Sequence, residues 1–267
     1  MQINSYFCTK IRTIMEHISK AQVKLVRSLQ QKKFRDELGL FVAEGEKCVE
    51  ELRKGFELVH LFREGENATH TEIEQMSGLR TPQGVIGVFK KPEESHELPT
   101  EPIEKHLTLA LDGIQDPGNL GTIIRTADWF GVHTILCSQD TADCYNPKVV
   151  QATMGALARV RIQYVDLPEL LRTGDRLWSL FPGQKRVTVY GTLLDGKNMY
   201  EKGAIPDKTW GLIIMGNEGN GISPEVRKHI THPLYIPAYT NEEASDTIES
   251  LNVSIATAIV LAEFRRP

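Results

Sequence analysis

Long apolar runs, paired cysteines and an excess of positive charge are all missing from this chain of 267 residues. No segment holds eighteen consecutive apolar residues, and the first twenty contain no uninterrupted apolar stretch, so we predict neither a membrane span nor a secretory signal. The four cysteines form no C-x-x-C pair, which argues against a zinc site and a disulfide framework. We therefore expect a soluble, cytoplasmic protein with reduced thiols, no bound metal and no membrane partner.

The net charge of -4 argues against a globally basic nucleic-acid binder, yet positive charge is concentrated near the N-terminus. Between Ile18 and Arg35 the chain has six basic residues and no acidic one, whereas the rest has 25 basic and 35 acidic residues. Two interpretations stay open for this segment, an RNA-binding face and an ordinary solvated helix face. The candidate RNA-binding residues are Lys20, Lys24, Arg27, Lys32, Lys33 and Arg35.

The N-terminal third has the pattern of a small α/β domain. Residues 19–34 place Val23, Val26 and Leu29 at helical spacing, which predicts one amphipathic helix. Strand-like and helix-like runs follow, until a polar segment with three prolines reads as a linker. We predict a small domain over residues 15–91, a linker over 92–105 and a second domain over 106–267.

Beyond the linker, strand-like and helix-like runs alternate with short connections, as in LTLALDGI followed by NLGTIIRTADWFG. Such alternation predicts a parallel sheet with helices on both faces. In such sheets ligands bind beyond the carboxyl ends of the strands, and three loops with unusual residues follow strands here. Because each half has its own apolar pattern, we expect the C-terminal half to fold after removal of residues 1–100.

The loop and helix over residues 112–132 carry two candidate site residues. Asn119 stands where a helix cap is expected, and Arg125 lies nearly two turns further on. Apolar positions surround Arg125, and a guanidinium held near a core needs carboxylate or phosphate partners. The alternative is a surface arginine paired with Asp116 or Asp128, and the sequence leaves both interpretations open.

The stretch GNEGNGIS, residues 216–223, has the glycine spacing of a phosphate-binding P-loop but has Ile222 in place of its lysine. Glu218 within the turn would oppose a polyphosphate. The glycines also fail the G-x-G-x-x-G fingerprint of dinucleotide sites. We therefore predict a ligand that is hydrogen-bonded rather than neutralised, such as a nucleoside without phosphates.

The third loop leads into the last helical run, where Ser250 is placed to cap a helix. The buried stripe predicted for that helix consists of Leu251, Ile255, Ala258, Ile259 and Ala262. Asn252 is unusual in a first helical turn, and its amide could instead face a neighbouring loop.

Three motifs in this order resemble one family, the SpoU (TrmH-type) RNA ribose 2′-O-methyltransferases of the SPOUT superfamily. They are N-L-G-T-I-I-R at 119–125, I-I-M-G-N-E-G at 213–219 followed by G-I-S, and Y-I-P at 235–237 followed by S-L-N-V-S at 250–254. The N-terminal part, in SKAQVKLVRSLQQKKFRDELGLFVAEG and TPQGVIGVF, is similar to the substrate-binding domain of many members.

The resemblance implies a parallel-sheet SPOUT domain tied into a deep trefoil knot, preceded by a small α/β substrate-binding domain. It also implies a homodimer with its active site near the subunit interface, and S-adenosylmethionine bound largely by backbone groups. The expected reaction is methylation of a ribose 2′-hydroxyl in structured RNA, with ribosomal RNA preferred because of the accessory domain. The alternatives are a transfer-RNA 2′-O-methyltransferase, a non-catalytic RNA-binding relative and a degenerate nucleotide-binding protein.

Positions that match the family motifs imply the site residues. The catalytic candidates are Asn119, Arg125, Glu218, Ser250 and Asn252, and the cofactor-binding candidates are Thr192, Met215, Gly216, Ile236 and Leu251. An arginine stays protonated in a protein, so we expect Arg125 to position an RNA phosphate and stabilise the developing alkoxide rather than act as a base. We expect Glu218 to orient Arg125 or to help close its loop.

The chain departs from the family pattern in the length between Y-I-P and S-L-N. Twelve residues lie there, 238–249, with four acidic groups and no basic one. A lid that closes over the cofactor and a tolerated surface insertion are both open interpretations of this loop.

Overall fold

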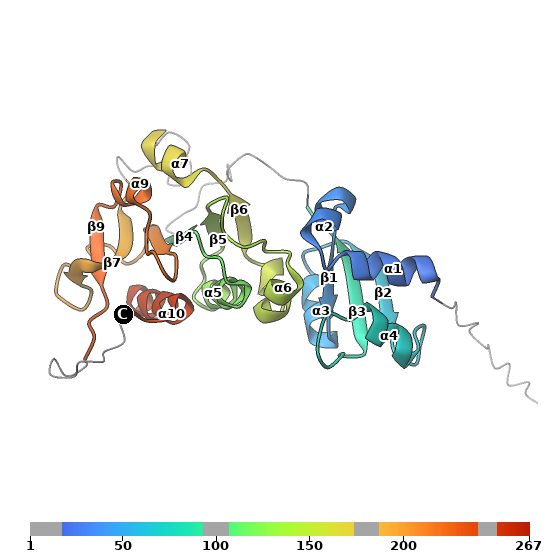
Figure 1. The fold of residues 1–267 in the computed structure, drawn as a ribbon. Helices are drawn as coiled ribbons and strands as arrows, with labels where there is room; N and C mark the ends of the chain where they lie inside the picture. The colour runs from blue at the N-terminus through green and yellow to red at the C-terminus, as the bar shows by residue number, and fades with distance from the viewer. Residues whose placement is uncertain (1–17, 93–106, 174–186, 240–249) are drawn as a thin grey trace, which may run out of the picture.

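The computed structural model describes residues 18–92, 107–173, 187–239 and 250–267. It contains a three-stranded sheet in residues 18–92, the N-terminal part, and a six-stranded sheet in residues 107–267, the C-terminal part (Figure 1). No helix in these ranges is long and apolar enough to cross a membrane.

An antiparallel sheet in the order β1-β3-β2 forms the base of the N-terminal part. Its strands and helices are β1 (Leu40–Glu44), β2 (Leu58–Arg63), β3 (Val85–Lys90), α1 (Lys20–Ser28), α2 (Lys32–Leu38), α3 (Glu46–Leu52) and α4 (His70–Met76). Successive residues of β1 face opposite sides of the sheet, so Val42 packs with α1 and α4 while Phe41 packs with α3.

The helix predicted over residues 19–34 is in fact two helices. α1 begins at a capping box in which Ser19 and Gln22 accept hydrogen bonds from each other's backbone N–H groups. It ends at Ser28, and the extended backbone of Gln31, with φ -99° and ψ 133°, precedes α2. Val26 is fully buried, as predicted. The apolar spacing therefore predicted the buried face but not the break.

The sheet of the C-terminal part is parallel throughout, in the order β6-β5-β4-β8-β7-β9. Its strands are β4 (Leu107–Asp112), β5 (Thr134–Cys137), β6 (Arg161–Tyr164), β7 (Val189–Asn198), β8 (Gly211–Gly216) and β9 (His232–Tyr235). Every residue of the central strands β4 and β8 is buried, which is typical of a parallel sheet covered on both faces. The predicted parallel sheet is confirmed.

Helices cover both faces of this sheet, with α5 and α10 on one face and α7 and α9 on the other (Figure 1). The helical segments are α5 (Pro117–Trp129), α6 (Pro147–Thr153), η1 (Ala156–Ala158), α7 (Leu167–Thr173), α9 (Pro224–Arg227) and α10 (Val253–Arg265). Leu109 of β4 packs in the cluster of α5 and α10, whereas the next residue, Ala110, packs in the cluster of α7 and α9.

The last helix begins later than predicted, and it buries a different face from the predicted one. Asn252 accepts hydrogen bonds from the backbone N–H groups of Ser254 and Ile255, so Asn252 caps α10 and Ser250 does not. Leu251 and Ile255 of the predicted stripe are 50% and 52% exposed. The buried residues are Val253, Ser254, Thr257, Val260, Leu261 and Phe264. Because the helix is apolar on both sides, its period alone did not identify the buried side.

The separate apolar patterns of the two parts do not make two separate cores. The largest buried apolar cluster joins Phe41 and Leu52 of the N-terminal part to Val150 and Leu157 of the C-terminal part. The rings of Phe41 and Tyr145 lie with their centroids 4.9 Å apart across this junction. The expectation that the halves are independent is therefore not supported by the packing.

Several predictions fall in segments outside the described residues. The linker predicted over 92–105 and most of the loop 238–249 are among these segments, so the domain boundaries and the role of that loop stay predictions. The trefoil knot also stays a prediction, because residues 240–249 connect β9 to α10.

Candidate active site

Three predicted catalytic residues from distant parts of the chain are hydrogen-bonded to one another. The Asn119 Nδ2 donates to Glu218 Oε1 at 2.9 Å, and the Asn252 Nδ2 donates to Asn119 Oδ1 at 2.9 Å. They come from the first turn of α5, the loop after β8 and the cap of α10. Together they form a polar row, here named the Asn119 row, at the carboxyl edge of the parallel sheet.

The cap of α10 determines the direction of the hydrogen bonds in the Asn119 row. The Asn252 Oδ1 accepts from the Ser254 backbone N–H at 3.0 Å and from the Ser254 hydroxyl at 2.6 Å. Its Nδ2 is then the end that faces Asn119, which accepts at Oδ1 and donates at Nδ2 to the Glu218 carboxylate. The Asn252 amide thus faces a neighbouring element while also capping its own helix.

Asp116, not Asn119, caps α5. The Asp116 Oδ1 accepts a hydrogen bond from the Asn119 backbone N–H at 2.8 Å, and Pro117 occupies the first helical turn. The cap predicted at Asn119 is therefore wrong by three positions, and the Asn119 side chain serves the row instead. An aspartate directly before a proline is a helix-start signal that was present in the sequence.

Arg125 lies on the exposed side of α5 without a carboxylate partner among the described residues. The Asp128 carboxylate is bound by Arg159 at 2.8 Å, and Asp116 caps the helix, so the predicted surface pairs are not formed. The interpretation as an arginine near the core is also wrong, because Ile124 beside it is buried while Arg125 is exposed. Its guanidinium is therefore accessible to an external anion.

Most backbone N–H groups of the glycine-rich loop are hydrogen-bonded within the loop, which disfavours a bound phosphate. The Asn217 Oδ1 accepts hydrogen bonds from the backbone N–H groups of Gly219 at 2.9 Å and Asn220 at 3.0 Å. Backbone bonds between Asn217 and Gly221 close the turn. Ile222, in the position of the P-loop lysine, is buried in the core. These contacts agree with the prediction that the loop binds no triphosphate.

Gly216, at the end of β8, has no room for a side chain. A Cβ atom there would lie 2.3 Å from the Gly221 carbonyl carbon and 2.4 Å from the Ile222 nitrogen, both backbone atoms. Two residues that the sequence analysis missed hold this loop in place. The Asp112 Oδ2 accepts from the Ser223 backbone N–H at 2.7 Å, and the Asn217 Nδ2 donates to the Gly113 carbonyl at 2.6 Å.

A polar residue directly after a buried apolar strand is a signal that could have identified these two positions. Asp112 ends the buried strand LTLALD, and Asn217 follows the buried strand GLIIMG. The carboxyl ends of parallel strands are where ligand-binding groups gather in such sheets.

The predicted cofactor-binding residues are partly brought together. Thr192 donates from its hydroxyl to the Met215 sulfur at 3.9 Å, and Gly216 follows Met215 in β8. Ile236 directly follows β9 and packs against the core, whereas Leu251 is half exposed before α10. Buried, mainly apolar surroundings at Met215 and Gly216 suit an uncharged ring system rather than a polyphosphate.

Ser250 has no partner that would place it in the Asn119 row. It is exposed and makes no hydrogen bond to the residues the structure describes. Its candidate catalytic role stays a prediction without a structural contact in support.

The basic N-terminal candidates divide into exposed and buried residues. Lys20, Lys24 and Arg27 are exposed on α1, and Lys33 is exposed on α2. Lys32 is exposed as well and binds Asp36 at 2.6 Å, a hydrogen bond that raises the pKa of Lys32.

Arg35 is not an RNA-binding residue, contrary to the prediction. It is 1% exposed, and its Nη2 lies 2.6 Å from Asp143 Oδ2 in the C-terminal part. Its Nη1 donates to the carbonyl groups of Leu29 and Gln30 at the end of α1. Arg35 therefore joins the two parts of the molecule.

No group of three or more histidine, cysteine, aspartate or glutamate residues within the described ranges is arranged to hold a metal ion. The described cysteines, Cys48, Cys137 and Cys144, are buried free thiols.

Comparison with known proteins identifies both parts of the chain. Residues 106–262 match the SpoU rRNA Methylase family, and residues 20–72 match the MRM3-like substrate binding domain. The chain is 30% identical over 266 residues to a 23S rRNA (guanosine(2553)-2'-O)-methyltransferase of Bacillus subtilis, covering 94% of this chain and 98% of that protein.

Solved structures give the same assignment. A TrmH-family protein from Porphyromonas gingivalis is 38% identical, with a TM-score of 0.76 over 93% of this chain and 98% of that one. An AdoMet-bound rRNA methyltransferase from Sinorhizobium meliloti is 30% identical, with a TM-score of 0.73 over 91% of this chain and 93% of that one. The chain therefore belongs to the SpoU rRNA methylase family.

Proposed function

We propose that this protein transfers a methyl group from S-adenosylmethionine to a ribose 2′-hydroxyl of ribosomal RNA. The observation that carries the proposal is the Asn119 row at the carboxyl edge of a parallel sheet, with the exposed Arg125 on the same helix as Asn119. The relative from Bacillus subtilis is named for this reaction on 23S rRNA, which favours ribosomal over transfer RNA.

The residues around Gly216 fit S-adenosylmethionine. In the loop that follows Gly216, the backbone N–H groups of Gly219 and Asn220 donate to the Asn217 side chain. The described residues of this loop, 217–221, include no lysine or arginine that could neutralise a polyphosphate. Thr192, Met215, Gly216 and Ile236 would hold the adenosine through backbone groups and apolar contacts. When bound, the cofactor supplies an electrophilic methyl group on a sulfonium, so the chain must only present the hydroxyl in line and remove its proton.

Arg125 is suited to bind the RNA rather than to take the proton. Its guanidinium stays protonated and offers donors to a backbone phosphate and to the 2′-oxygen as negative charge develops. Glu218 contacts Asn119 and not Arg125 in this structure, so we assign it to holding the glycine-rich loop against α5. The exposed residues Lys20, Lys24, Arg27, Lys32 and Lys33 are proposed to contact RNA phosphates further from the reaction.

We further propose that the protein is a cytoplasmic homodimer. Trp129 on α5 is 85% exposed, and Leu251 and Ile255 at the start of the adjacent α10 are half exposed. Exposed apolar side chains at both ends of two packed helices are typical of a subunit interface. Sedimentation equilibrium tests this, because two chains are expected and a monomer at micromolar concentration would contradict it.

The methylation proposal is tested with purified protein, radiolabelled S-adenosylmethionine and an unmodified 23S rRNA transcript. We expect label in the RNA, and mass spectrometry of the digested RNA should place it on a ribose 2′-oxygen. Calorimetry with S-adenosylmethionine serves as the second measurement. Absence of both transfer and cofactor binding would favour the non-catalytic RNA-binding alternative, and methylation of a base would contradict the proposal.

A further inference from the structure

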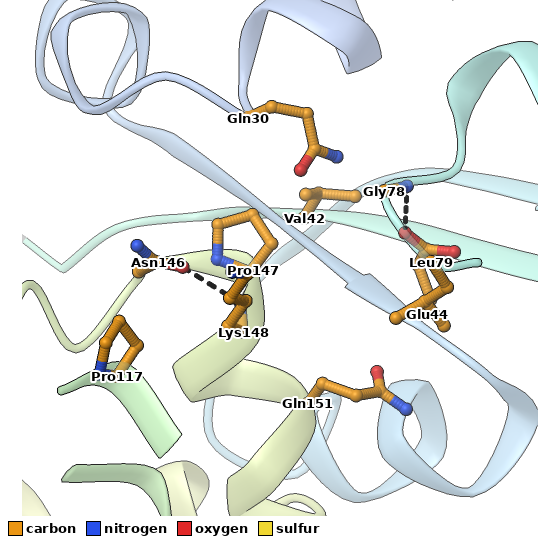
Figure 2. Close-up of a pocket in the computed structure, with 10 residues that line it drawn as sticks. All are labelled: Gln30, Val42, Glu44, Gly78, Leu79, Pro117, Asn146, Pro147, Lys148 and Gln151. Carbon is orange, nitrogen blue, oxygen red and sulfur yellow. Dashed lines mark hydrogen bonds between the residues drawn. The ribbon is translucent and has the colours of Figure 1, made fainter. Parts of the chain in front are cut away.

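A cavity of about 240 Å³ lies between the N-terminal and C-terminal parts, beside the shared core. Figure 2 shows residues from both parts around it, with Gln30 on one side and Gln151 of α6 on the other. Val42 and Leu79 contribute apolar surface from the N-terminal part, and Pro117 and Pro147 contribute it from the C-terminal part. The cavity therefore exists only because the two parts are packed together.

Gln30 lines this cavity, and its amide group contains a buried donor, Nε2, without a hydrogen-bond partner among the described residues. Leaving a buried donor unpaired is unfavourable, and native proteins keep few such groups, often where a ligand or water completes them. The carboxamide of Gln151 lines the same space and makes no hydrogen bond to any described residue. The cavity lining thus contains two amide side chains, those of Gln30 and Gln151.

Glu44 adds a carboxylate that is held in position. It is 4% exposed and accepts hydrogen bonds from the Ser77 hydroxyl and the Gly78 backbone N–H. Lys148, an exposed residue of α6, also lines the cavity and can meet a phosphate near the surface. Apolar walls, oriented amide and carboxylate groups and a nearby cation together match the faces, edges and backbone of a nucleotide.

The cavity and the Asn119 row both involve the first turn of α5. Pro117 lines the cavity at the start of α5, and Asn119 stands two residues further along the same turn. An RNA strand that reaches the Asn119 row therefore approaches the same end of α5 that lines the cavity. The volume is slightly below the about 300 Å³ of the smallest typical ligand pockets, which suits one ring system rather than a whole nucleotide.

We propose that this cavity binds the base of an unpaired nucleotide that flanks the methylated one. The proposal rests on the proposed function, because it needs an RNA substrate. Gln30 and Gln151 read the polar edge of the base, and the apolar residues cover its faces. This makes the junction of the two parts a specificity site, in addition to the electrostatic contacts of α1.

The test combines protein variants with substrates that lack one base. The variants are Gln30→Leu and Gln151→Leu, and the matched control is Gln75→Leu, an exposed glutamine near the end of α4 that does not line the cavity. Binding of an unmodified 23S rRNA transcript and its methylation are measured for each. We expect each cavity variant to weaken RNA binding about 3- to 10-fold, the effect of a lost hydrogen bond, with unchanged S-adenosylmethionine affinity.

After the methylated position is mapped, each flanking nucleotide is replaced in turn by an abasic one. At the nucleotide that enters the cavity, wild type should lose at least about the same 3- to 10-fold, and the Gln30→Leu variant should lose less than wild type does. The proposal would be overturned if the abasic substitution and the Gln30→Leu substitution weakened RNA binding additively at every flanking position. It would also be overturned if the cavity variants bound RNA as tightly as the Gln75→Leu control. Because RNA binding by the protein variants is measured without turnover and needs no mapped position, a lack of methylation by wild type would count against the proposed function alone.

Discussion

Arg125 is the single residue whose removal should separate chemistry from cofactor binding. Its guanidinium is exposed and unpaired among the described residues, and its proposed partner is RNA. We expect Arg125→Ala to slow methyl transfer about 10²- to 10³-fold, because a donor to the developing oxyanion is lost. Calorimetry should show unchanged S-adenosylmethionine affinity.

The control for Arg125→Ala is Arg172→Ala, which removes an exposed arginine bound to Glu169 on α7. That variant should methylate normally. A near-normal single-turnover rate for Arg125→Ala would remove Arg125 from the site.

Gly216 should not tolerate even a methyl group. A Cβ there would meet the backbone of Gly221 and Ile222, so Gly216→Ala must push the glycine-rich loop away from β8. We expect S-adenosylmethionine affinity, measured by calorimetry, to fall at least about tenfold. Gly219→Ala is the matched control in the same loop, since its Cβ would lie an ordinary 3.6 Å from the Asn217 side chain. Equal cofactor affinities for the two variants would contradict this account.

The sequence predicted which residues would meet in the site better than what each residue does. Asn119, Glu218 and Asn252 were predicted together and are hydrogen-bonded. Asn119 and Ser250 were wrongly predicted as caps, because several polar residues near each helix start could serve and only the backbone angles select one. Arg35 was misassigned because its charge is visible in the sequence and its partner, 108 residues away, is not.

At the scale of elements, the ion pair of Arg35 and Asp143 joins α2 to the segment before α6. The side chains are 2% and 11% exposed, so removing one partner leaves the other charge poorly solvated. We expect Arg35→Met to lower the free energy of unfolding by about 3–5 kcal/mol, as measured by urea titration. Lys32→Met should cost at most about 1 kcal/mol, because its ion pair with Asp36 is exposed.

A second variant shows whether this effect comes from the buried charge. Arg35→Met combined with Asp143→Asn removes both charges and should recover part of the lost stability. If Arg35→Met costs no more than Lys32→Met, the pair does not hold the two parts together.

The order of strands and helices was predictable because strand and helix periods differ, and the parallel sheet followed from their alternation. The buried face of α10 was not, since Leu251 and Ile255 are as apolar as Val260 and Leu261. The break between α1 and α2 was hidden because helix-compatible residues fill it. Both errors concern choices made by tertiary packing rather than by local sequence.

At the scale of the whole molecule, the shared core makes the C-terminal part dependent on the N-terminal part. Removing residues 1–100 would expose Tyr145, Val150 and Leu157, which pack against Phe41 and its neighbours. We now expect the truncated protein to unfold at a lower urea concentration than the full chain, or to aggregate. A cooperative transition with an unchanged midpoint would contradict a shared core.

Buried acidic groups should make the molecule sensitive to alkali. Burial raises the pKa of Cys48 to about 11 and that of Cys144 to about 12, and it also raises the pKa of Tyr164. In the unfolded chain a thiol ionises at about pH 8.5. The contribution of these buried thiols to the free energy of unfolding is therefore fully present below that pH. It is lost as pH rises toward 11 for Cys48 and 12 for Cys144, by up to about 1.4 kcal/mol per pH unit for each thiol.

Urea titrations between pH 7 and pH 10.5 measure this dependence. The free energy of unfolding should be nearly constant below pH 8 and should fall above it. A Cys48→Ala, Cys144→Ala variant is expected to be less stable at pH 7 but to lose less on going to pH 10.5. Equal pH slopes for the variant and the wild type would show that these thiols are not the cause.

The most direct test of the central claim is a map of ribose 2′-O-methyl groups in ribosomal RNA from cells with and without the gene. We predict that a mark on the large-subunit RNA disappears in the deletion strain. It should return with the wild-type gene and not with Arg125→Ala, provided both proteins accumulate equally. An unchanged map of ribosomal RNA, or restoration by Arg125→Ala, would contradict the account.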